Sequence, residues 1–430
     1  MVTELTALPS GEQIDVARIQ RRTLRLLVGT QIIGGLGVAI GITVGALLTA
    51  RLGGPGISGL AQSSAVIGGA LLAVPVTRLM NTYGRRPGLA LAYLAGALGG
   101  VLVVAGAMVG WVSLIFLGLF LFGGGTTANL QARFTAVDLA DPARRGRQLS
   151  IVVWATTIGA VVAPNLADPA DAALAGFGLP PLTGPFAFSA AAFVVAAGVL
   201  LLFLRPDPLL TARRVAQPQA TNVTSRRDGG LRGALRVVAA RPAARLGIVA
   251  VAVGHLVMVG VMAMTPVHLG DSHGDADVLR VVGIVLSLHI AGMYALSPVV
   301  GWLTDRFGRR AVILVGIALL LAACAVAGTA GYDTPRLSIG LILLGLGWSC
   351  TMVAGSTLLS ESVPVEVRPA AQGLSDLAMG LAGALAGALS GFVVGLAGYA
   401  LLNLLAAITI VPLIALALRP LPATAGTKGA

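Results

Sequence analysis

The chain has 430 residues, of which 56% are hydrophobic and only 11% are charged. This composition excludes an ordinary soluble domain, in which about a quarter of the residues carry a charge. The formal net charge of +12 could suggest a nucleic-acid partner. However, the basic residues concentrate between long apolar segments, which indicates a membrane protein and no nucleic-acid partner.

Apolar runs long enough to cross a membrane recur along the whole sequence. A membrane helix needs about 20 apolar residues. Such runs are centred near residues 38, 68, 98, 122, 157, 194, 256, 290, 320, 346, 383 and 407. The pattern predicts an all-α membrane protein with twelve transmembrane helices.

The placement of the basic residues predicts the orientation in the membrane. If the N-terminus is cytoplasmic and the helices alternate, all of the 29 Lys and Arg residues except Arg51, Arg280 and Arg336 lie on the cytoplasmic side. Cytoplasmic loops are enriched in Lys and Arg, so we expect both termini in the cytoplasm. The polar start of the chain lacks the apolar stretch of a cleaved signal peptide. We expect a multi-pass protein of a bacterial inner membrane, surrounded by lipid and functional as a monomer.

The expected organisation is two six-helix bundles joined by a basic linker. Its parts are a cytoplasmic tail (1–23), a first bundle (24–204), the linker (205–244), a second bundle (245–418) and a second tail (419–430). The linker is polar and rich in Pro and Gly, which predicts partial disorder. Its last part, LRGALRVVAARPAARL, is amphipathic and can lie on the membrane surface.

The two predicted bundles repeat one another in sequence. VTRLMNTYGRR (76–86) aligns with VGWLTDRFGRR (300–310), 224 residues further on. At a spacing of 223 residues, Asp138 aligns with Glu361 and Arg145 aligns with Arg368. Parallel repeats of this kind are typical of transporters whose two halves are related by a pseudo-two-fold axis.

The stretch GWLTDRFGRR (301–310) resembles the loop signature G-x-L-x-D-R-x-G-R-R of the major facilitator superfamily. The resemblance covers nearly the whole chain and implies a secondary transporter, not an enzyme. Such a transporter is expected to work by alternating access, with this loop latching one conformation. The implied latch residues are Gly301, Asp305, Arg306, Gly308, Arg309 and Arg310, with Arg85 and Arg86 in the first half.

The chemistry of the latch residues agrees with this role. The Asp305 carboxylate can accept hydrogen bonds from a helix N-terminus or an arginine. Gly301 and Gly308 allow close helix approach and a tight turn. The first half departs from the signature, because Thr77 and Asn81 replace the first Gly and the Asp. We expect a weaker latch there.

Two further features of proton-coupled members are missing. The fourth helix often carries a buried arginine before a Gly-rich stretch in such proteins, but residues 115–129 hold the glycines and no arginine. The fifth helix often carries a Gly-Pro pair, but here Gly159 and Pro164 are separated. Both departures count against an ordinary drug–proton antiporter.

Histidine and methionine concentrate in the stretch GHLVMVGVMAMTPVHL (254–269). On a helix, Met258 and Met262 share one face with His255. In the next predicted helix, His289 and Met293 again share a face. At about 1.5 Å of rise per residue, both pairs reach the middle of the membrane, so adjacent helices could bring the four side chains into one cavity.

Thioether and imidazole groups together favour a soft ion of low charge, and Cu(I) fits best. The spacing M-x-x-x-M followed by H-x-x-x-M also resembles the copper-importing CcoA-like branch of the superfamily. That resemblance implies that Met258, Met262, His289 and Met293 bind copper as cargo. His255 and His268 are then relay groups or hydrogen-bond partners of the ligands. No resident cofactor is expected.

A small organic solute is the alternative cargo. Related transporters carry organic molecules, including riboflavin, so a riboflavin-like or drug-like solute, with or without proton coupling, also fits. The polar and aromatic residues that would then contact the cargo are Gln31, Asn129, Gln131, Trp154, Asn165, His289, Tyr294 and Trp348.

Overall fold

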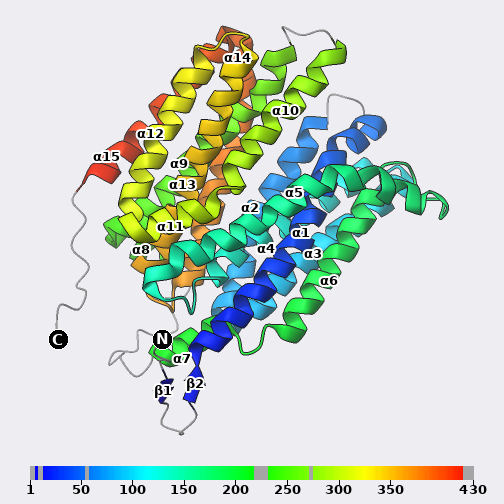
Figure 1. The fold of residues 1–430 in the computed structure, drawn as a ribbon. Coiled ribbons are helices and arrows are strands. Elements are labelled where there is room, and N and C mark those ends of the chain that lie inside the picture. The colour runs from blue at the N-terminus through cyan, green and yellow to red at the C-terminus, as the bar shows by residue number, and fades with distance from the viewer. Residues whose placement is uncertain (1–4, 8–12, 54–57, 217–230, 271–274, 420–430) are drawn as a thin grey trace.

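The structure is a computed structural model that describes residues 5–7, 13–53, 58–216, 231–270 and 275–419. Helices make up nearly all of it and gather in two lobes (Figure 1). Near the N-terminus, strands β1 (Leu5–Ala7) and β2 (Gln13–Asp15) form a short antiparallel hairpin. The structure therefore confirms the predicted all-α membrane fold with two bundles.

The first lobe consists of six long helices. They are α1 (Val16–Gly53), α2 (Ser58–Tyr83), α3 (Arg85–Val109), α4 (Val112–Thr135), α5 (Arg145–Ala175) and α6 (Gly184–Phe203), with the short turn η2 (Pro142–Arg144) before α5. Helix α1 begins within the stretch that the sequence suggested as an N-terminal tail.

The second lobe follows a linker that holds two short helices, α7 (Pro208–Ala216) and α8 (Leu231–Ala240). Helix α8 is the amphipathic piece expected from the sequence. The lobe itself contains α9 (Pro242–Gly270), α10 (Asp275–Tyr294), α11 (Ser297–Phe307), α12 (Arg309–Gly328), α13 (Thr334–Ser362), α14 (Arg368–Thr409) and α15 (Val411–Leu418).

The described helices are long enough for the twelve membrane crossings that the sequence predicts. In the described residues, ten helical segments are long and apolar enough to span a membrane. One of them, Arg368–Leu418, is long enough to cross twice and has non-helical backbone at Ala397 and Gly398, where α14 breaks. Helix α5 is not among the ten, but it contains the uncharged apolar stretch 149–166 and lies in the bundle beside α1.

Close packing through small residues holds the first lobe together. A Cβ atom on Gly68 would collide with the carbonyl oxygen of Phe120, and one on Gly123 would collide with that of Ala65. Helices α2 and α4 therefore touch along their backbones. Membrane helices have little hydrophobic drive to associate, so such dispersion contacts supply much of the stability.

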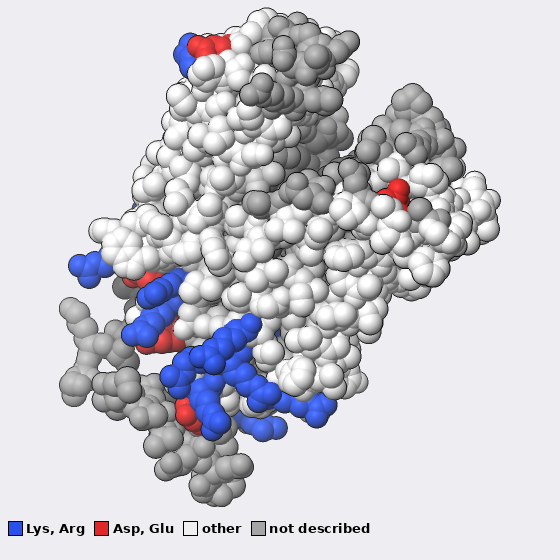
Figure 2. All heavy atoms as spheres, turned by 45° about the vertical axis from the view of Figure 1, so that its right-hand side comes forward, with Lys and Arg blue, Asp and Glu red and all other residues white. Residues whose placement is uncertain are grey.

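The two lobes meet chiefly through α2 against α14 and α5 against α11. Arginine side chains gather at one end of the molecule, which is called the basic end here (Figure 2). Helices α3, α5, α12 and α14 begin at this end. The lobes diverge toward the opposite end (Figures 1 and 2).

Candidate functional site

Two matching charge clusters join the lobes at the basic end. In the first, Arg85 at the start of α3 donates to both carboxylate oxygens of Asp138, at 2.7 and 3.1 Å, and Arg368 of α14 lies 3.8 Å from the same carboxylate. The Arg85 and Asp138 side chains are both fully buried. Each partner needs the other, because an isolated charge is costly in a dry interface.

The second cluster repeats the first with the lobes exchanged. Arg309 at the start of α12 donates to both oxygens of Glu361, at 3.0 and 2.7 Å. Arg145 of α5 lies 3.7 Å from that carboxylate. The repeat detected in the sequence therefore corresponds to two charge clusters, each with an arginine from its own lobe and one from the other.

Asp305 lies at the N-terminus of α5 and so links the second lobe to the first. Its carboxylate accepts the backbone N–H groups of Gly146 at 2.9 Å and Arg147 at 2.8 Å. The guanidinium of Arg309 lies 3.4 Å from the same carboxylate. The approach is close because Gly301 has no side chain, and a Cβ there would collide with Ser150.

The other predicted latch residues have separate roles in the geometry. Gly308 has a φ of 92°, a conformation that suits glycine at the sharp turn into α12. Arg310 donates to the carbonyl of Ala417 at 2.6 Å and so ties α12 to α15. Arg306 is exposed at the end of α11. The backbone N–H of Arg86 donates to Asp207 at 2.8 Å.

The first-lobe copy of the latch uses an arginine from the linker. Asn81 does not cap α14. Its side-chain oxygen and its carbonyl both accept from Arg213 of α7 at 2.6 Å. Arg213 also donates to the carbonyl of Glu366, just before α14, at 3.1 Å. The linker helix therefore bridges the lobes where the sequence lacks the signature aspartate.

A buried ion pair lies between the lobes, next to the first charge cluster. Arg133 of α4 donates to Asp376 of α14 at 2.6 Å, and their side chains are 1% and 2% exposed. Gln131 donates to the other oxygen of Asp376 at 2.7 Å, and Arg85 donates to Gln372. These bonds all cross from the first lobe to α14.

Arg133 uses only part of its hydrogen-bonding capacity. Its Nε and Nη1 atoms are buried and have no hydrogen-bond partner among the described residues. The guanidinium lies 4.6 Å from the ring centre of Phe134, and Tyr294 and His255 lie close enough to interact with its charge. Buried polar groups normally find a partner, so this arginine can donate hydrogen bonds to water or to a cargo molecule.

Next to Arg133, α9 and α13 contribute aromatic groups. Trp348 donates from its indole nitrogen to Nδ1 of His255 at 3.1 Å. Its ring also meets Tyr294 edge-on, with 5.5 Å between centres. A Cβ on Gly383 of α14 would lie 2.9 Å from Nε2 of His255, so the small residue makes room for the imidazole.

The predicted copper ligands lie in the second lobe around α13. Met258 and Met293 belong to one buried core, and Met262 packs against it. His289 is fully buried, and its Nδ1 atom bonds the carbonyl of Leu341 in α13 at 2.8 Å. Helix α10 packs mainly against α13 and only slightly against α9. The four-ligand site therefore stays a prediction.

His289 nevertheless keeps a free ring nitrogen. Its Nε2 atom has no hydrogen-bond partner in the described part of the chain. In the same described residues, no group of three His, Cys, Asp or Glu side chains is placed to hold a metal ion. Any copper ligation here would thus depend on the methionines.

His268 lies apart from these groups, near the end of α9. Its ring stacks between Tyr332 and Tyr399, with centres 4.8 and 4.5 Å away, and its Nε2 atom bonds the carbonyl of Gly331 at 2.7 Å. These contacts account for the histidine as a structural residue.

The residues suggested for an organic cargo are not all available. Asn129 bonds the Tyr93 hydroxyl at 2.8 Å, and Gln131 is held by Asp376. Gln31 is buried with a free side-chain oxygen, and Trp154 is partly exposed. The side chain of Asn165 lies outside the described residues.

Sequence reasoning missed Arg133 and Asp376. The Gly-rich stretch 115–129 contains no arginine, but Arg133 follows four positions later in the same helix. Asp376 lies two turns into α14. A charge within an apolar helix is itself a signal of function, but both residues are close enough to a helix end to be taken for membrane-edge charges.

Comparison with known proteins agrees with this architecture. The family model described as Major Facilitator Superfamily matches residues 26–279 and 278–429. The chain belongs to the major facilitator superfamily. It is therefore a multi-pass membrane transporter, and the superfamily fold accounts for its two related bundles.

Among relatives in this superfamily, the uncharacterised transporter YddS of Bacillus subtilis is 37% identical over 393 residues, covering 91% of this chain and 89% of YddS. The riboflavin transporter RfnT of Brucella anthropi is 27% identical over 416 residues, covering 96% of this chain and 98% of RfnT. Among solved structures, the superfamily transporter FucP in the outward conformation gives a TM-score of 0.67 at 16% identity, covering 92% of this chain and 97% of FucP. That likeness concerns the fold alone.

Proposed function

We propose that the protein carries a small organic solute across the membrane by alternating access, and that the solute is a flavin or a molecule of similar size and polarity. The similarity to the riboflavin transporter RfnT supports this cargo class, because it extends over 96% of the chain and 98% of RfnT. The copper-importing branch expected from the Met/His spacing has no comparable support.

The buried Arg133–Asp376 pair is the observation on which the transport mechanism rests. It joins the lobes at the basic end, where the charge clusters and the Asp305 cap also join them. For the lobes to rock, all these bonds must break together. The described state is therefore closed at the basic end, and the reverse state exposes Arg133 and Asp376 to the transport path.

The groups beside this pair suit a planar, polar cargo. Trp348 and Tyr294 offer aromatic faces, and His255 offers a ring nitrogen. Arg133 itself adds free donors. Ligand sites typically combine apolar or aromatic walls with a few such polar groups.

Orientation follows from charge. The basic end is expected to face the cytoplasm, because Lys and Arg are enriched on that side of membrane proteins. Both termini then lie in the cytoplasm and the opposite end of the molecule faces the outside of a bacterial inner membrane.

Uptake of labelled riboflavin tests this function. The chain is expressed in riboflavin-auxotrophic cells that lack their own importer, and uptake is compared with cells carrying the empty vector. We expect saturable uptake that unlabelled riboflavin suppresses. Absence of uptake while the protein is present in the membrane would contradict the flavin assignment.

Copper is the second candidate cargo, favoured by the free Nε2 atom of buried His289 and by the buried methionines Met258 and Met293 in the core of the same lobe. A neutral imidazole with thioethers suits Cu(I). Measurement of cellular copper in the same cells separates the two candidates, since each predicts accumulation of one cargo and not the other.

A further inference from the structure

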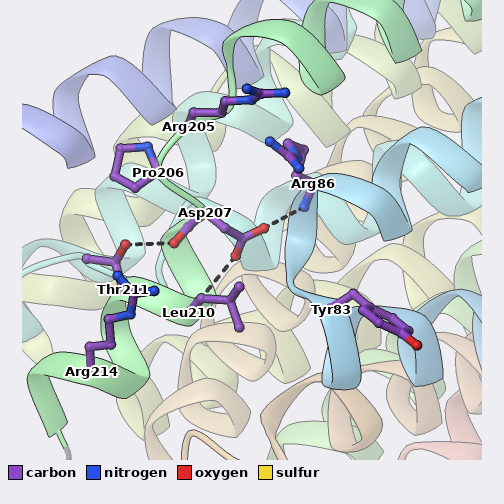
Figure 3. A pocket seen from close by; sticks show the side chains of 8 residues that line it. All are labelled: Tyr83, Arg86, Arg205, Pro206, Asp207, Leu210, Thr211 and Arg214. Atoms are coloured by element: carbon purple, nitrogen blue, oxygen red, sulfur yellow. Dashed lines mark hydrogen bonds between the residues drawn. The ribbon is translucent and has the colours of Figure 1, made fainter.

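A pocket of about 310 Å³ opens at the basic end, outside the interface between the lobes (Figure 3). It lies between the turn that joins α2 to α3 and the segment that joins α6 to α7. Its volume is at the lower end of the range for small-ligand sites. The lining residues are Tyr83, Arg86, Arg205, Pro206, Asp207, Leu210, Thr211 and Arg214.

Asp207 fixes the shape of this pocket. One carboxylate oxygen accepts the backbone N–H groups of Leu209 and Leu210 at 3.0 and 3.2 Å, which caps α7. The other accepts the backbone N–H of Arg86 at 2.8 Å. The carboxylate also fills the space where a Cβ on Gly84 would lie. It is thus committed to the backbone.

The three arginines of the pocket have no acidic partner within the described part of the chain. No salt bridge of the described residues involves Arg86, Arg205 or Arg214. Figure 3 shows the side chains of Arg86 and Arg205 converging on one side of the pocket, with Arg214 on another. With Asp207, the lining carries a net charge of about +2. Gathered guanidinium groups favour an anion that can accept several hydrogen bonds, and phosphate does so best.

Lipid-facing surface leads directly to this pocket. Leu202 and Phe203, at the end of α6 just before Arg205, are 65% and 49% exposed. On the adjacent helix α3, Leu91 and Leu94 are each 43% exposed. Acyl chains lying on these residues would bring a lipid headgroup to the level of the arginines.

We propose that this pocket binds the phosphate group of an anionic ligand, supplied by the headgroup of an anionic phospholipid or by free phosphate. Basic pockets at the ends of membrane helices bind anionic headgroups through the same chemistry. The pocket is separate from the proposed cargo site between the lobes.

A ligand in this pocket acts on α7, the linker helix that bridges the lobes. Arg214 is adjacent to Arg213, which holds Asn81 and Glu366 across the lobes. A phosphate that holds Arg214 also steadies α7. A ligand that binds the folded state stabilises it, so occupancy is measurable as a higher unfolding temperature.

Native mass spectrometry of the full chain tests the proposal. The protein is purified from membranes that contain phosphatidylglycerol and phosphatidylcholine in equal amounts, and the ratio of retained lipids is measured. The variant Arg86→Ala, Arg205→Ala, Arg214→Ala removes the pocket charges. We expect the preference for phosphatidylglycerol to fall more than tenfold, since one basic residue near an anionic surface contributes roughly a fivefold preference.

The matched control is Arg21→Ala, Arg22→Ala, Arg25→Ala, which removes three exposed charges at the start of α1. It should keep the preference for phosphatidylglycerol. A parallel thermal-unfolding measurement adds inorganic phosphate to delipidated protein. Stabilisation by phosphate without any lipid preference would identify free phosphate as the source. Equal retention of both lipids with no effect of phosphate, or equal losses in the two triple variants, would overturn the proposal.

Discussion

Arg133 donates to Asp376 at 2.6 Å across the boundary between the two lobes, with both side chains almost completely buried. The two residues are 243 positions apart in the sequence. Each lies on a helix that has no other charged residue, apart from Arg368 at the start of α14. Buried charged groups of this kind contribute little net stability, although removing one partner is costly. The pair must separate whenever the basic end opens, so we expect it to act in transport.

Removal of one member of this pair should damage both stability and transport. Arg133→Met leaves the Asp376 carboxylate buried with only Gln131 as partner, and we expect a loss of about 3–5 kcal/mol. Arg133→Met combined with Asp376→Leu leaves no lone charge, so the unfolding temperature should recover while riboflavin uptake stays absent. Both quantities are measured on the same membrane preparations.

The control for the pair is Arg22→Met, which removes an exposed arginine of α1. It should change stability by less than about 0.5 kcal/mol and leave uptake intact. If the Arg133→Met, Asp376→Leu double variant transports riboflavin normally, the pair serves only the fold.

Loss of the Asp305 cap should shift the protein toward the state that is open at the basic end. In Asp305→Ala, the N–H groups of Gly146 and Arg147 lose their acceptor, which is worth about 0.5–2 kcal/mol. A change of 1.4 kcal/mol alters a population ratio about tenfold. Spin labels at the exposed ends of α2 and α11, on Thr82 and Phe307, report the distance between the lobes after Cys324 and Cys350 are replaced by alanine.

The opposite change in the first lobe should act in the opposite direction. Asn81→Asp places a carboxylate next to the guanidinium of Arg213, which strengthens the linker bridge by a charge-assisted bond. The short-distance population should then grow relative to the unmodified protein. Equal shifts in the same direction from Asp305→Ala and Asn81→Asp would show that neither group controls the closed state.

These residues also show what sequence reasoning can reach. The role of Asp305 as a helix cap could be predicted, because the signature in the second half places a carboxylate and a small residue at a helix end. The partner of Asn81 could not, since Arg213 lies in a linker whose position depends on the packed lobes. Arg133 and Asp376 have no local sequence partner at all. Their pairing becomes apparent only in the folded structure, where α4 and α14 pack together.

The Met/His pattern illustrates the reverse case. Its helical spacing predicts that Met258 and Met293 face inward, and both are buried, but periodicity says nothing about which helix each face meets. Helix α10 turns His289 toward Leu341 of α13, and that choice depends on Gly345, where a Cβ would collide with the backbone of His289.

Shape-conserving changes at the predicted copper ligands should separate the two cargo proposals. Met262→Leu with His289→Gln removes a sulfur atom and the imidazole but keeps side-chain volume and a donor for Leu341. The organic-solute proposal predicts that riboflavin uptake persists in this variant. Copper accumulation by the unmodified protein that is lost in this variant, with no riboflavin uptake in either, would instead favour copper as the cargo, and is measured by elemental analysis of the cells.

Trp348 should govern affinity for an aromatic cargo. Trp348→Phe keeps a ring in the core but removes the indole N–H that donates to His255. The imidazole loses its anchor, and the larger aromatic face is reduced. A hydrogen bond and an aromatic contact are together worth about 1–2 kcal/mol, so the KM for riboflavin should rise roughly five- to thirtyfold. Initial rates of uptake over a range of concentrations give KM and the maximal rate separately.

Trp302→Phe is the matched control for this change, because Trp302 is half exposed on α11 and its ring contacts only Phe307 among the described aromatic residues. It should leave KM unchanged. A cargo that binds through Trp348 also quenches the fluorescence of that residue, so the quenching by riboflavin in purified protein should fall in Trp348→Phe and persist in Trp302→Phe. A normal KM in Trp348→Phe, together with unchanged quenching, would place the cargo elsewhere in the transporter.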